Sequence, residues 1–384
     1  MGNDSTHGDL SATDRWLDDP APDGEGGMLG LSVAWSLAEP DRVGQVVMVP
    51  DGSTIEIGRG EDMARFGVFR PGGVQPGPAL TGRMLSRRQL VVTARTGQLD
   101  VRNSGSCALL AGGVRVAQAT LDVGDVIELD RQLVLVAIRR FPIPEPLTAL
   151  PLGAPDANGL VGESAAMWRV RAQVAFLARR HEPVLITGPS GTGKELAARA
   201  IHDRSSRTRG PWVARNAATL PATLIDAELF GNARNYPNAG MPDRPGLVGA
   251  AHEGSLFLDE IGELPEALQA HLLRVIDRDG TYQRLGEARE RRSNFRFLAA
   301  TNRDPGALKH DFVSRLTLSL ALPGLDERRE DIPLLVAHLL SSARDDPDTA
   351  ERLFDGAHAR MTPSFVVALL RHRYTTHVRE LEQL

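Results

Sequence analysis

The chain has 384 residues, of which 44 are lysine or arginine and 49 are aspartate or glutamate, so its formal net charge at pH 7 is −5. This balance gives no sign of a globally basic nucleic-acid binder. Cys107 is the only cysteine, which excludes a framework of intrachain disulfides and favours a reducing compartment. No apolar run approaches the roughly 18 to 20 residues that span a bilayer, so we expect no membrane partner and a bacterial cytoplasmic protein.

The first 27 residues are polar and acidic, and they lack the basic start and apolar stretch of a secretory signal. We therefore expect a disordered leader over residues 1–27. The remaining length is enough for two or three domains, each with its own core.

Residues 28–140 contain short β-like runs with turn signals between them, which predicts an all-β sandwich. The runs are LSVAW, QVVMV, STIEIG, LVVTA, LDVRN, GVRV, VIELD and LVLVAIRR. A proline-rich stretch follows over residues 141–158, and we interpret it as a semi-rigid linker between two domains.

Four short motifs stand out in this segment: Gly58-Arg59, the run LSRRQ (85–89), Asn103-Ser-Gly and Gly124-Asp125. Their placement resembles that in a forkhead-associated (FHA) domain, a reader of phosphothreonine. The resemblance implies a phosphothreonine protein or peptide as a partner.

The resemblance also implies that Arg59, Ser86, Arg87 and Asn103 form the phosphopeptide site. Arg59 would pair with the phosphate, Ser86 would donate a hydrogen bond to it, and Asn103 would hold the peptide backbone. Gln89 stands where the family usually has a histidine. The alternative is a sandwich that serves only assembly contacts.

Next, a strand-like run, PVLIT (183–187), leads into a glycine-rich segment and then a helical pattern, the order that a phosphate cradle requires. The loop residues are Gly188, Pro189, Ser190, Gly191, Thr192, Gly193, Lys194 and Glu195. The glycines let backbone N–H groups face an anion, and the helix adds the positive end of its dipole. Lys194 supplies a mobile charge for the β- and γ-phosphates of ATP. It is one of only two lysines, which marks it as a chemical requirement.

A second motif, GSLFLDE (254–260), is a short apolar run that ends in two acids. This pattern is typical of a buried parallel strand with carboxylates at its C-terminal edge. In a P-loop ATPase, Asp259 would help hold Mg²⁺ through its waters and Glu260 would polarise the attacking water. The alternative is a strand that exits into an acidic, solvated loop, and the P-loop upstream argues against it.

Residues 159–384 contain a series of motifs in a fixed order: GES (162–164), VLITGPSGTGKELAARAIH (184–202), NAA (216–218), ELFG (228–231), GSLFLDEIGELP (254–265), LLRVIDRDGTYQRLG (272–286), ATN (300–302), LPGLDERREDIPLL (322–335) and VREL (378–381). Together they closely resemble the AAA+ domain of bacterial enhancer-binding proteins, the ATPases that activate sigma-54 RNA polymerase. The resemblance implies a multidomain chain with an α/β P-loop AAA+ domain containing a parallel sheet over 159–325. An incomplete C-terminal helical lid would follow over 326–384.

The resemblance assigns nucleotide contacts. Leu160, Val161 and Gly162 would lie near the adenine, Asn302 would sense the γ-phosphate or the attacking water, and Arg379 would be the second sensor on the lid. Glu195 replaces the serine or threonine of other P-loops, which is normal in this family.

The resemblance also implies self-association into a ring, a hexamer or heptamer, in which arginine fingers of one subunit reach the neighbour's nucleotide. Where the family has a pair of arginines, this chain has Lys309 and Arg315. We expect Arg315 to be the finger and Lys309 to be a substituted one, because lysine lacks the planar fork of arginine. A surface ion pair is the alternative for Arg315.

Sigma-54 activators carry a GAFTGA loop that grips the sigma factor, but here residues 235–240 read NYPNAG and are followed by MPDRPG. The phenylalanine–threonine pair is missing, and Pro237 and Pro242 restrict the backbone. Either the loop has a different target or the protein does something other than open a sigma-54 promoter complex.

These observations predict an ATP-driven transcriptional regulator that phosphothreonine sensing controls. Its partners would be other copies of the chain, a phosphothreonine protein, and sigma-54 RNA polymerase if the altered loop can still engage it. DNA would be bound only by a domain outside these residues, because the chain stops inside the second-sensor helix. One alternative is a signalling scaffold that reads phosphopeptides and binds ATP but hydrolyses it poorly. Another is a protein-remodelling ATPase, which lacks a pore-loop signature here.

Overall fold

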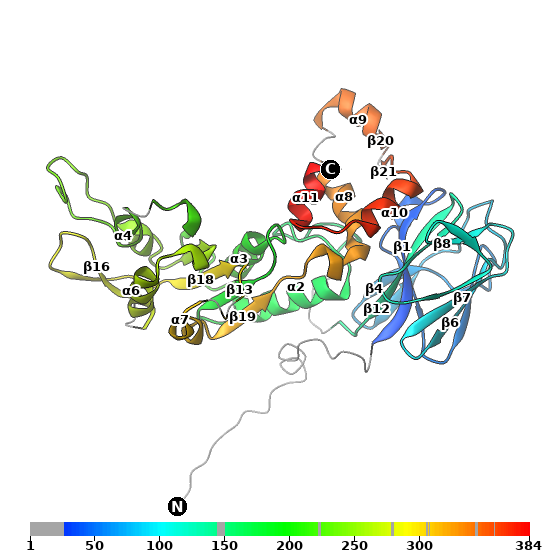
Figure 1. Ribbon diagram of the computed structural model, residues 1–384, viewed down its shortest axis with the longest axis horizontal. Coiled ribbons are helices and arrows are strands. Elements are labelled where there is room, and N and C mark those ends of the chain that lie inside the picture. The colour runs from blue at the N-terminus through cyan, green and yellow to red at the C-terminus, as the bar shows by residue number, and fades with distance from the viewer. Residues whose placement is uncertain are drawn as a thin grey trace, which may run out of the picture. The chain divides into compact units, whose positions relative to one another are not determined.

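The computed structural model describes residues 27–143, 150–221, 224–277, 280–304, 306, 308–341, 345–356 and 358–384. The expected leader, apart from Gly27, and residues 144–149 of the expected linker lie outside this set. The chain divides into two compact units. The first comprises the residues up to Pro155, Val161–Ala172 and Leu325–Arg373, and the second comprises Asp156–Leu160, Gln173–Gly324 and Tyr374–Leu384 (Figure 1).

The first unit contains two antiparallel sheets with strand orders β5-β4-β2-β1-β12-β11-β8-β9 and β10-β7-β6-β3. The strands are β1 (Met28–Ser36), β2 (Val46–Val49), β3 (Thr54–Ile57), β4 (Gly67–Arg70), β5 (Gly73–Pro76), β6 (Leu90–Arg95), β7 (Gln98–Asn103), β8 (Leu109–Ala111), β9 (Val114–Val116), β10 (Gln118–Leu121), β11 (Val126–Leu129) and β12 (Leu133–Arg140). The β-rich N-terminal region predicted from the sequence is confirmed.

The two sheets share one hydrophobic core. Strand β6 shows the expected alternation: Leu90, Val92 and Ala94 point into the core, while the residues between them are less buried. Strand β1 is buried along nearly its whole length because it meets the second sheet on one face and α10 on the other.

Helices and short strands from the C-terminal part of the chain complete this unit. They are η5 (Leu325–Glu327), η6 (Arg329–Asp331), α8 (Ile332–Ser341), α9 (Pro347–Leu353), β20 (Phe354–Asp355), β21 (His358–Ala359) and α10 (Pro363–Arg371). Helix α10 begins with a proline after Thr362, whose hydroxyl accepts a bond from the Phe365 N–H at 3.2 Å. It packs against β1, β11 and β12. The indole of Trp35 in β1 donates to the Met361 carbonyl at 2.8 Å, so the sandwich and the helices form one body.

The second unit is built on a five-stranded sheet with the order β14-β15-β18-β13-β19, in which every neighbouring pair is parallel. Its strands are β13 (Val184–Thr187), β14 (Trp212–Asn216), β15 (Ser255–Asp259), β18 (Arg296–Thr301) and β19 (Leu318–Ala321). The helices are α3 (Lys194–Asp203), α4 (Ile225–Phe230), α5 (Gly246–Ala250), α6 (Glu266–Asp277), α7 (His310–Arg315) and α11 (His377–Gln383), and β16 (Thr281–Gln283) and β17 (Glu290–Arg292) form a hairpin. The predicted α/β domain with a parallel sheet is confirmed.

Strands β15 and β18 are almost completely buried, as expected for parallel strands covered on both faces. Their order in the sheet decides where the motifs meet. Strand β13 lies beside β18, and β18 lies beside β15, so the carboxyl ends of these three strands share one edge. The segments that follow them therefore come together there.

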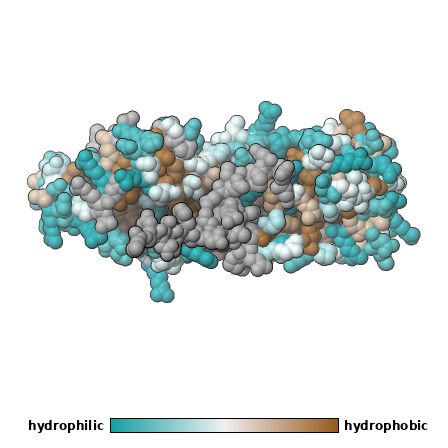
Figure 2. Space-filling model, turned by 90° about the horizontal axis from the view of Figure 1, so that it is seen from below, coloured by the Kyte–Doolittle hydropathy of each residue, from teal (hydrophilic) through white to brown (hydrophobic). Residues whose placement is uncertain are grey.

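On the face shown in Figure 2, hydrophilic side chains predominate and hydrophobic patches lie between them. Within the described parts of the chain, none of the helices combines the length and apolar character that crossing a bilayer demands.

Candidate functional site

The glycine-rich loop connects β13 to α3 at the carboxyl edge of the parallel sheet. Gly188, Gly191 and Gly193 have φ values of +146°, +77° and +94°, a region that other residues rarely enter. At Gly191 a Cβ would lie only 2.1 Å from the Thr376 carbonyl oxygen. Glycine is therefore required there both for the backbone conformation and for the close approach of another segment.

The side chain of Lys194 curls back into this loop. It is 7% exposed, and its Nζ donates to the carbonyls of Gly188 at 3.0 Å and Pro189 at 3.1 Å. Burial lowers the pKa of Lys194, while the charges of Glu260 and Asp259 oppose that shift. The ammonium group is thus held by the loop in the electrostatic field of both acids.

Asp259 ends β15 and Glu260 follows it at the same edge, and both are half-buried. The Glu260 N–H donates to Asp259 Oδ1 at 2.9 Å. Glu260 has φ +51°, a left-handed conformation that turns the chain at the end of the strand. The site therefore combines one ammonium group, two carboxylates and a glycine-rich loop. A nucleotide bound with Mg²⁺ requires these groups, so the residues present fit Mg²⁺ and a nucleotide.

Helix α11 lies against the loop. The Val378 N–H donates to the Gly191 carbonyl at 3.2 Å, and Arg379 Nη1 donates to Ser190 Oγ at 3.3 Å. The Glu380 carboxylate fixes the start of the helix by accepting the Thr375 N–H at 2.7 Å. The structure thereby brings Arg379 and the P-loop together.

The other residues expected to contact nucleotide are distributed as follows. Asn302 is exposed just after β18, at the shared edge. Glu195 is exposed in the first turn of α3, and the buried Thr192 donates its hydroxyl to the Pro189 carbonyl at 2.9 Å.

Leu160 is buried in the second unit, whereas Val161 and Gly162 belong to the first. Lys309 precedes α7 and Arg315 ends it, and both are exposed.

In the sandwich, hydrogen bonds join the loops that are expected to read a phosphopeptide. The Arg59 N–H donates to the Ser86 carbonyl at 3.2 Å, and Arg59 Nε donates to the Leu85 carbonyl at 2.8 Å. Arg59 and Arg87 are exposed, while Ser86 is half-buried. The Ser86 hydroxyl lies 3.1 Å from the Ser106 hydroxyl. Two arginines and two hydroxyls therefore occupy neighbouring loops.

Gln89 is a residue whose role the sequence did not reveal. Its side chain is fully buried, and its Oε1 accepts the Ser86 N–H at 3.0 Å. Its Nε2 donates to Asn103 Oδ1 at 2.7 Å and to the Cys107 carbonyl at 2.8 Å. A Cβ at Gly105 would lie 2.4 Å from Gln89 Oε1, so that glycine is what lets the amide fit. Gln89 therefore scaffolds these loops.

Asn103 is expected to hold a peptide backbone, but its amide is already engaged inside the loop. Besides its bond with Gln89, Oδ1 accepts the Gly105 N–H at 3.3 Å, and Nδ2 donates to the Cys107 carbonyl at 2.9 Å. Holding a peptide would require this amide to exchange partners.

The segment at the position of the GAFTGA loop is folded back on itself. The buried Asn232 donates its amide to the carbonyls of Ala233 at 3.0 Å, Tyr236 at 3.3 Å and Pro242 at 2.9 Å. At the tip, the Gly240 N–H donates to Asn235 Oδ1 at 2.9 Å.

Arg284 ties the base of this segment to the neighbouring hairpin. Its Nη1 donates to Asp243 Oδ2 at 2.9 Å, and its Nε donates to Glu287 Oε2 at 2.7 Å. Hydrogen bonds from Arg291 and then Arg284 lower the pKa of Glu287 to about 2. The two segments thus form one bonded unit.

Residues 160–320 match the family model of the sigma-54 interaction domain. The response regulator protein PilR of Pseudomonas aeruginosa is 36% identical in an alignment of 285 residues that covers 72% of this chain and 60% of PilR. The DNA-binding transcriptional regulator NtrC of Azospirillum brasilense is 38% identical in an alignment of 264 residues that covers 66% of this chain and 53% of NtrC. The chain thus spans less than two thirds of the length of either relative.

Among solved structures, the crystal structure of NtrX from Brucella abortus in complex with ATP is similar with a TM-score of 0.51 and 32% identity, over 58% of this chain and 50% of NtrX. The same protein in complex with ADP gives a TM-score of 0.52 and 33% identity, over 59% of this chain and 50% of NtrX. Residues 160–320 are therefore similar to the sigma-54 interaction domain, and the similarity to bacterial transcriptional regulators extends over a longer part of the chain.

Proposed function

We propose that this chain is an ATP-dependent transcriptional regulator related to the sigma-54 activators. The observation that carries the proposal is the meeting of four groups at the carboxyl edge of the parallel sheet: the glycine loop, Lys194, the Asp259–Glu260 pair and Asn302. The ATP bound by NtrX gives a precedent in a similar structure. Mg·ATP would supply the phosphoryl group whose transfer to water drives the regulator.

Each residue has a separate task in this proposal. The loop N–H groups and Lys194 would bind the β- and γ-phosphates, and Asp259 would help to hold the metal ion. Glu260 orients the attacking water, a task performed only in the transition state. Asn302 and Arg379 sense the γ-phosphate. Arg315, with Lys309 in the place of a second arginine, would act on the nucleotide of a neighbouring subunit in a ring.

Lys194→Ala tests the nucleotide site, and Arg199→Ala is its matched control. Arg199 lies on the same helix, but it is exposed and pairs with Asp203. ATP with Mg²⁺ at about 100 times its dissociation constant should stabilise the wild type and the control by roughly 2.7 kcal/mol. This stabilisation should vanish in Lys194→Ala. A thermal shift that persists in that variant would remove the site assignment.

For the sandwich, we propose recognition of a phosphothreonine peptide by Arg59, Ser86 and Arg87, with Asn103 contributing after exchange of its partners. The support is the exposed pair of arginines beside the Ser86 hydroxyl. Paired peptides that differ only in the phosphate provide the test. The wild type should bind only the phosphorylated form, and Arg59→Ala should bind neither. Equal binding of both peptides by the wild type would reduce the sandwich to an assembly module.

For the loop, we propose that residues 235–240 do not grip sigma-54 in the usual way, because the phenylalanine–threonine pair is missing and the segment is bonded internally. The chain, or a longer form with a DNA-binding domain, should therefore hydrolyse ATP without opening a sigma-54 promoter complex. ATP-dependent transcription from such a promoter would overturn this part of the proposal and make Tyr236 the candidate for a substitute contact.

A further inference from the structure

A small cavity in the first unit lies where a long helix begins. Its volume is about 240 Å³, and all of its lining residues belong to this unit. They come from the turn between β10 and β11, from β12, from the start of α2 (Ala165–Ala178) and from the segment around η5 and η6. The polar part of the lining includes Ser164, Arg139, Arg328 and Arg329. Three arginines and a helix start therefore border the same small space.

The start of α2 contributes backbone donors that have no acceptor. The first N–H groups of any helix lack partners within the helix itself. The Ser164 hydroxyl accepts the Met167 N–H at 3.2 Å, but the N–H groups of Ala165 and Ala166, which line the cavity, have no acceptor among the described residues. The first turn also contains no acidic side chain. The positive end of the helix dipole therefore lies at the cavity.

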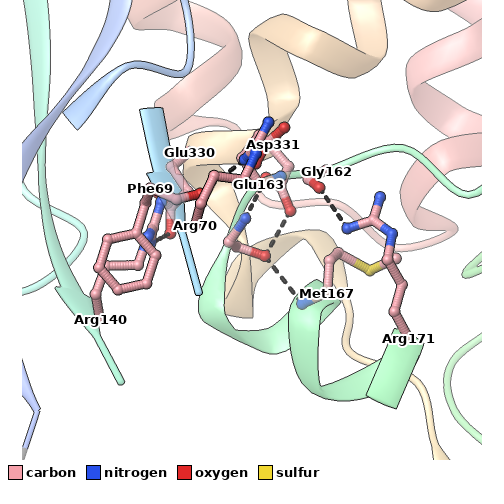
Figure 3. Close-up of polar contacts among 10 residues, drawn as sticks. Phe69, Arg70, Arg140, Gly162, Glu163, Met167, Arg171, Glu330 and Asp331 are labelled. Atoms are coloured by element: carbon pink, nitrogen blue, oxygen red, sulfur yellow. Dashed lines mark hydrogen bonds and ion pairs between the residues drawn. The ribbon is translucent and has the colours of Figure 1, made fainter. Parts of the chain in front are cut away.

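The two acids nearest the helix start are already engaged, as Figure 3 shows. Asp331 Oδ1 accepts the N–H groups of Glu163 at 2.7 Å and Ser164 at 2.9 Å, and its Oδ2 accepts the Ser164 hydroxyl at 2.6 Å. Glu330, which lines the cavity, is held at two points by Arg140: Nη1 donates to Oε1 at 2.6 Å, and Nη2 donates to Oε2. Neither carboxylate is therefore left to neutralise a further arginine.

Two other acids line the cavity. Asp326 Oδ1 accepts a bond from Arg329 Nη2 at 3.1 Å, so this carboxylate is paired as well. Glu327 is exposed, and solvent and salt screen an exposed charge. The acids of the lining thus leave part of its positive charge unmatched.

Arg328 carries the clearest sign of a missing partner. It is 4% exposed, and its Nε has no hydrogen-bond partner in the part of the chain that the structure describes. Its Nη1 donates to Met167 Sδ at 2.7 Å, but a thioether is a weak acceptor. Burial lowers the pKa of Arg328, and the charges of Asp331 and Glu327 oppose that shift. Burying a guanidinium without a hydrogen-bonded anion is costly, so an anion beside it would be stabilised.

Arg139 adds a second charge of the same kind. It is half-buried, and its Nε is also buried without a hydrogen-bond partner among the described residues. Guanidinium groups and the N–H groups at a helix start are the donors that proteins use for phosphate oxygens. A tetrahedral oxyanion offers enough acceptors to satisfy several such donors at once.

We propose that this cavity binds a small oxyanion of the phosphate class. The anion would accept hydrogen bonds from Arg328, from Arg139 and from the N–H groups of Ala165 and Ala166, and we call this the anion site. Its volume of about 240 Å³ lies below the roughly 300–1,000 Å³ of pockets for drug-sized ligands, so it suits one phosphate group, either free or on a small monoester. The site is separate from the glycine-rich loop, which belongs to the second unit.

Isothermal titration of the full chain with inorganic phosphate, at constant ionic strength, tests the anion site. The wild type should bind phosphate, and Arg328→Met should weaken this binding by on the order of tenfold or more, because a charged hydrogen-bond donor is lost. The glycine-rich loop can also take phosphate, so the titration is repeated with Lys194→Ala, in which binding at the anion site should persist. Glycerol 3-phosphate distinguishes the two sources: tighter binding than inorganic phosphate identifies a monoester, and weaker binding identifies the free anion.

Thermal unfolding provides a second readout, with Arg42→Met as the matched control. Arg328→Met removes an unmatched buried charge, so in phosphate-free buffer it should be at least as stable as the wild type. Phosphate should then raise the melting temperature of the wild type more than that of Arg328→Met. Arg42 is also buried, but its Nε donates to Glu39 Oε1 at 2.7 Å and its Nη2 donates to the carbonyls of Pro78 and Ala79 at 3.1 and 2.8 Å. Arg42→Met should therefore lower the melting temperature in both buffers and leave phosphate binding unchanged.

Four results would overturn the inference. Equal phosphate affinity in the wild type and Arg328→Met would show that this arginine binds no anion. Complete loss of binding in Lys194→Ala would assign all bound phosphate to the glycine-rich loop. An equal loss in Arg42→Met would show only general damage to the first unit. A lower stability of Arg328→Met in phosphate-free buffer would show that the guanidinium is matched without any anion.

Discussion

Gly191→Ala and Gly193→Ala form a matched pair, because both glycines adopt left-handed conformations in the same loop. A Cβ in that region costs about 1–2 kcal/mol at either position. Their surroundings differ. A Cβ at Gly193 would meet only Leu196 Cδ1 at 3.8 Å, an ordinary contact, whereas a Cβ at Gly191 would lie 2.1 Å from the Thr376 carbonyl oxygen. Only Gly191→Ala must therefore push another part of the backbone away.

Relief of that clash requires the start of α11 to move by roughly 1 Å, a shift that overpacked sites make at a cost of about 1–3 kcal/mol. The movement would break the bond from the Val378 N–H to the Gly191 carbonyl and separate Arg379 from Ser190. We therefore expect Gly193→Ala to lose about 1–2 kcal/mol and Gly191→Ala about 2–5 kcal/mol.

Amide hydrogen exchange in the ligand-free protein measures this difference at α11. An additional 1–3 kcal/mol corresponds to exchange that is roughly 5- to 150-fold faster in Gly191→Ala than in Gly193→Ala. The acceleration should be largest at the Val378 amide. Equal protection of α11 in the two variants would refute the claim that this glycine is required for close approach.

Glu260→Gln should bind ATP normally but hydrolyse it about 10²- to 10⁴-fold more slowly in a phosphate-release assay, and normal turnover would mean that another group orients the water. ATPase activity should rise more than linearly with protein concentration, and Arg315→Ala should lower it by on the order of 10³-fold. Activity that stays proportional to protein concentration down to the monomer would exclude an arginine finger supplied by a neighbouring subunit. Gln89→Ala should destabilise the sandwich by about 1–3 kcal/mol in urea unfolding, because it leaves buried polar groups unpaired, and an unchanged midpoint would deny its scaffolding role. The stabilising contact of Glu287 should be present above pH 4.5, its ordinary pKa, and be lost as the pH falls through about 2. Carboxyl NMR should follow this titration, and Arg291→Ala should shift the midpoint upward; an ordinary midpoint in the wild type would contradict the hydrogen-bonded geometry.

The parallel sheet and the glycine-rich loop could be predicted because their signals are local. Strand β15 is a continuous apolar run that ends in two acids, and the loop follows β13 directly. The position of Asn302 beside these groups depends on strand order, which no local pattern contains. Strands β4, β5, β8 and β10 were not predicted, because their sequences, GVFR, GVQP, LLA and QATL, carry no clear alternation of apolar and polar residues and each strand is defined by its pairing partner.

The contacts that support the sites were harder to foresee. Arg140 and Glu330 are 190 positions apart, and nothing near Arg140 distinguishes it from the other arginines of the chain. Gln89 could be noticed as a substitution for histidine, but only the structure shows that its amide joins Ser86 to Asn103. Buried polar partners are chosen by the three-dimensional fold, so sequence spacing reveals them poorly.

The internal bonding of residues 232–246 has a consequence for how this segment meets a partner. A tip already shaped by Asn232 and Asn235 has few backbone conformations left to lose on contact, so little ordering entropy opposes binding. Selectivity for a partner then depends on shape complementarity to a surface that is already formed before binding. Because Arg284 links the base to the hairpin by hydrogen bonds, we expect the two segments to meet a partner as one surface.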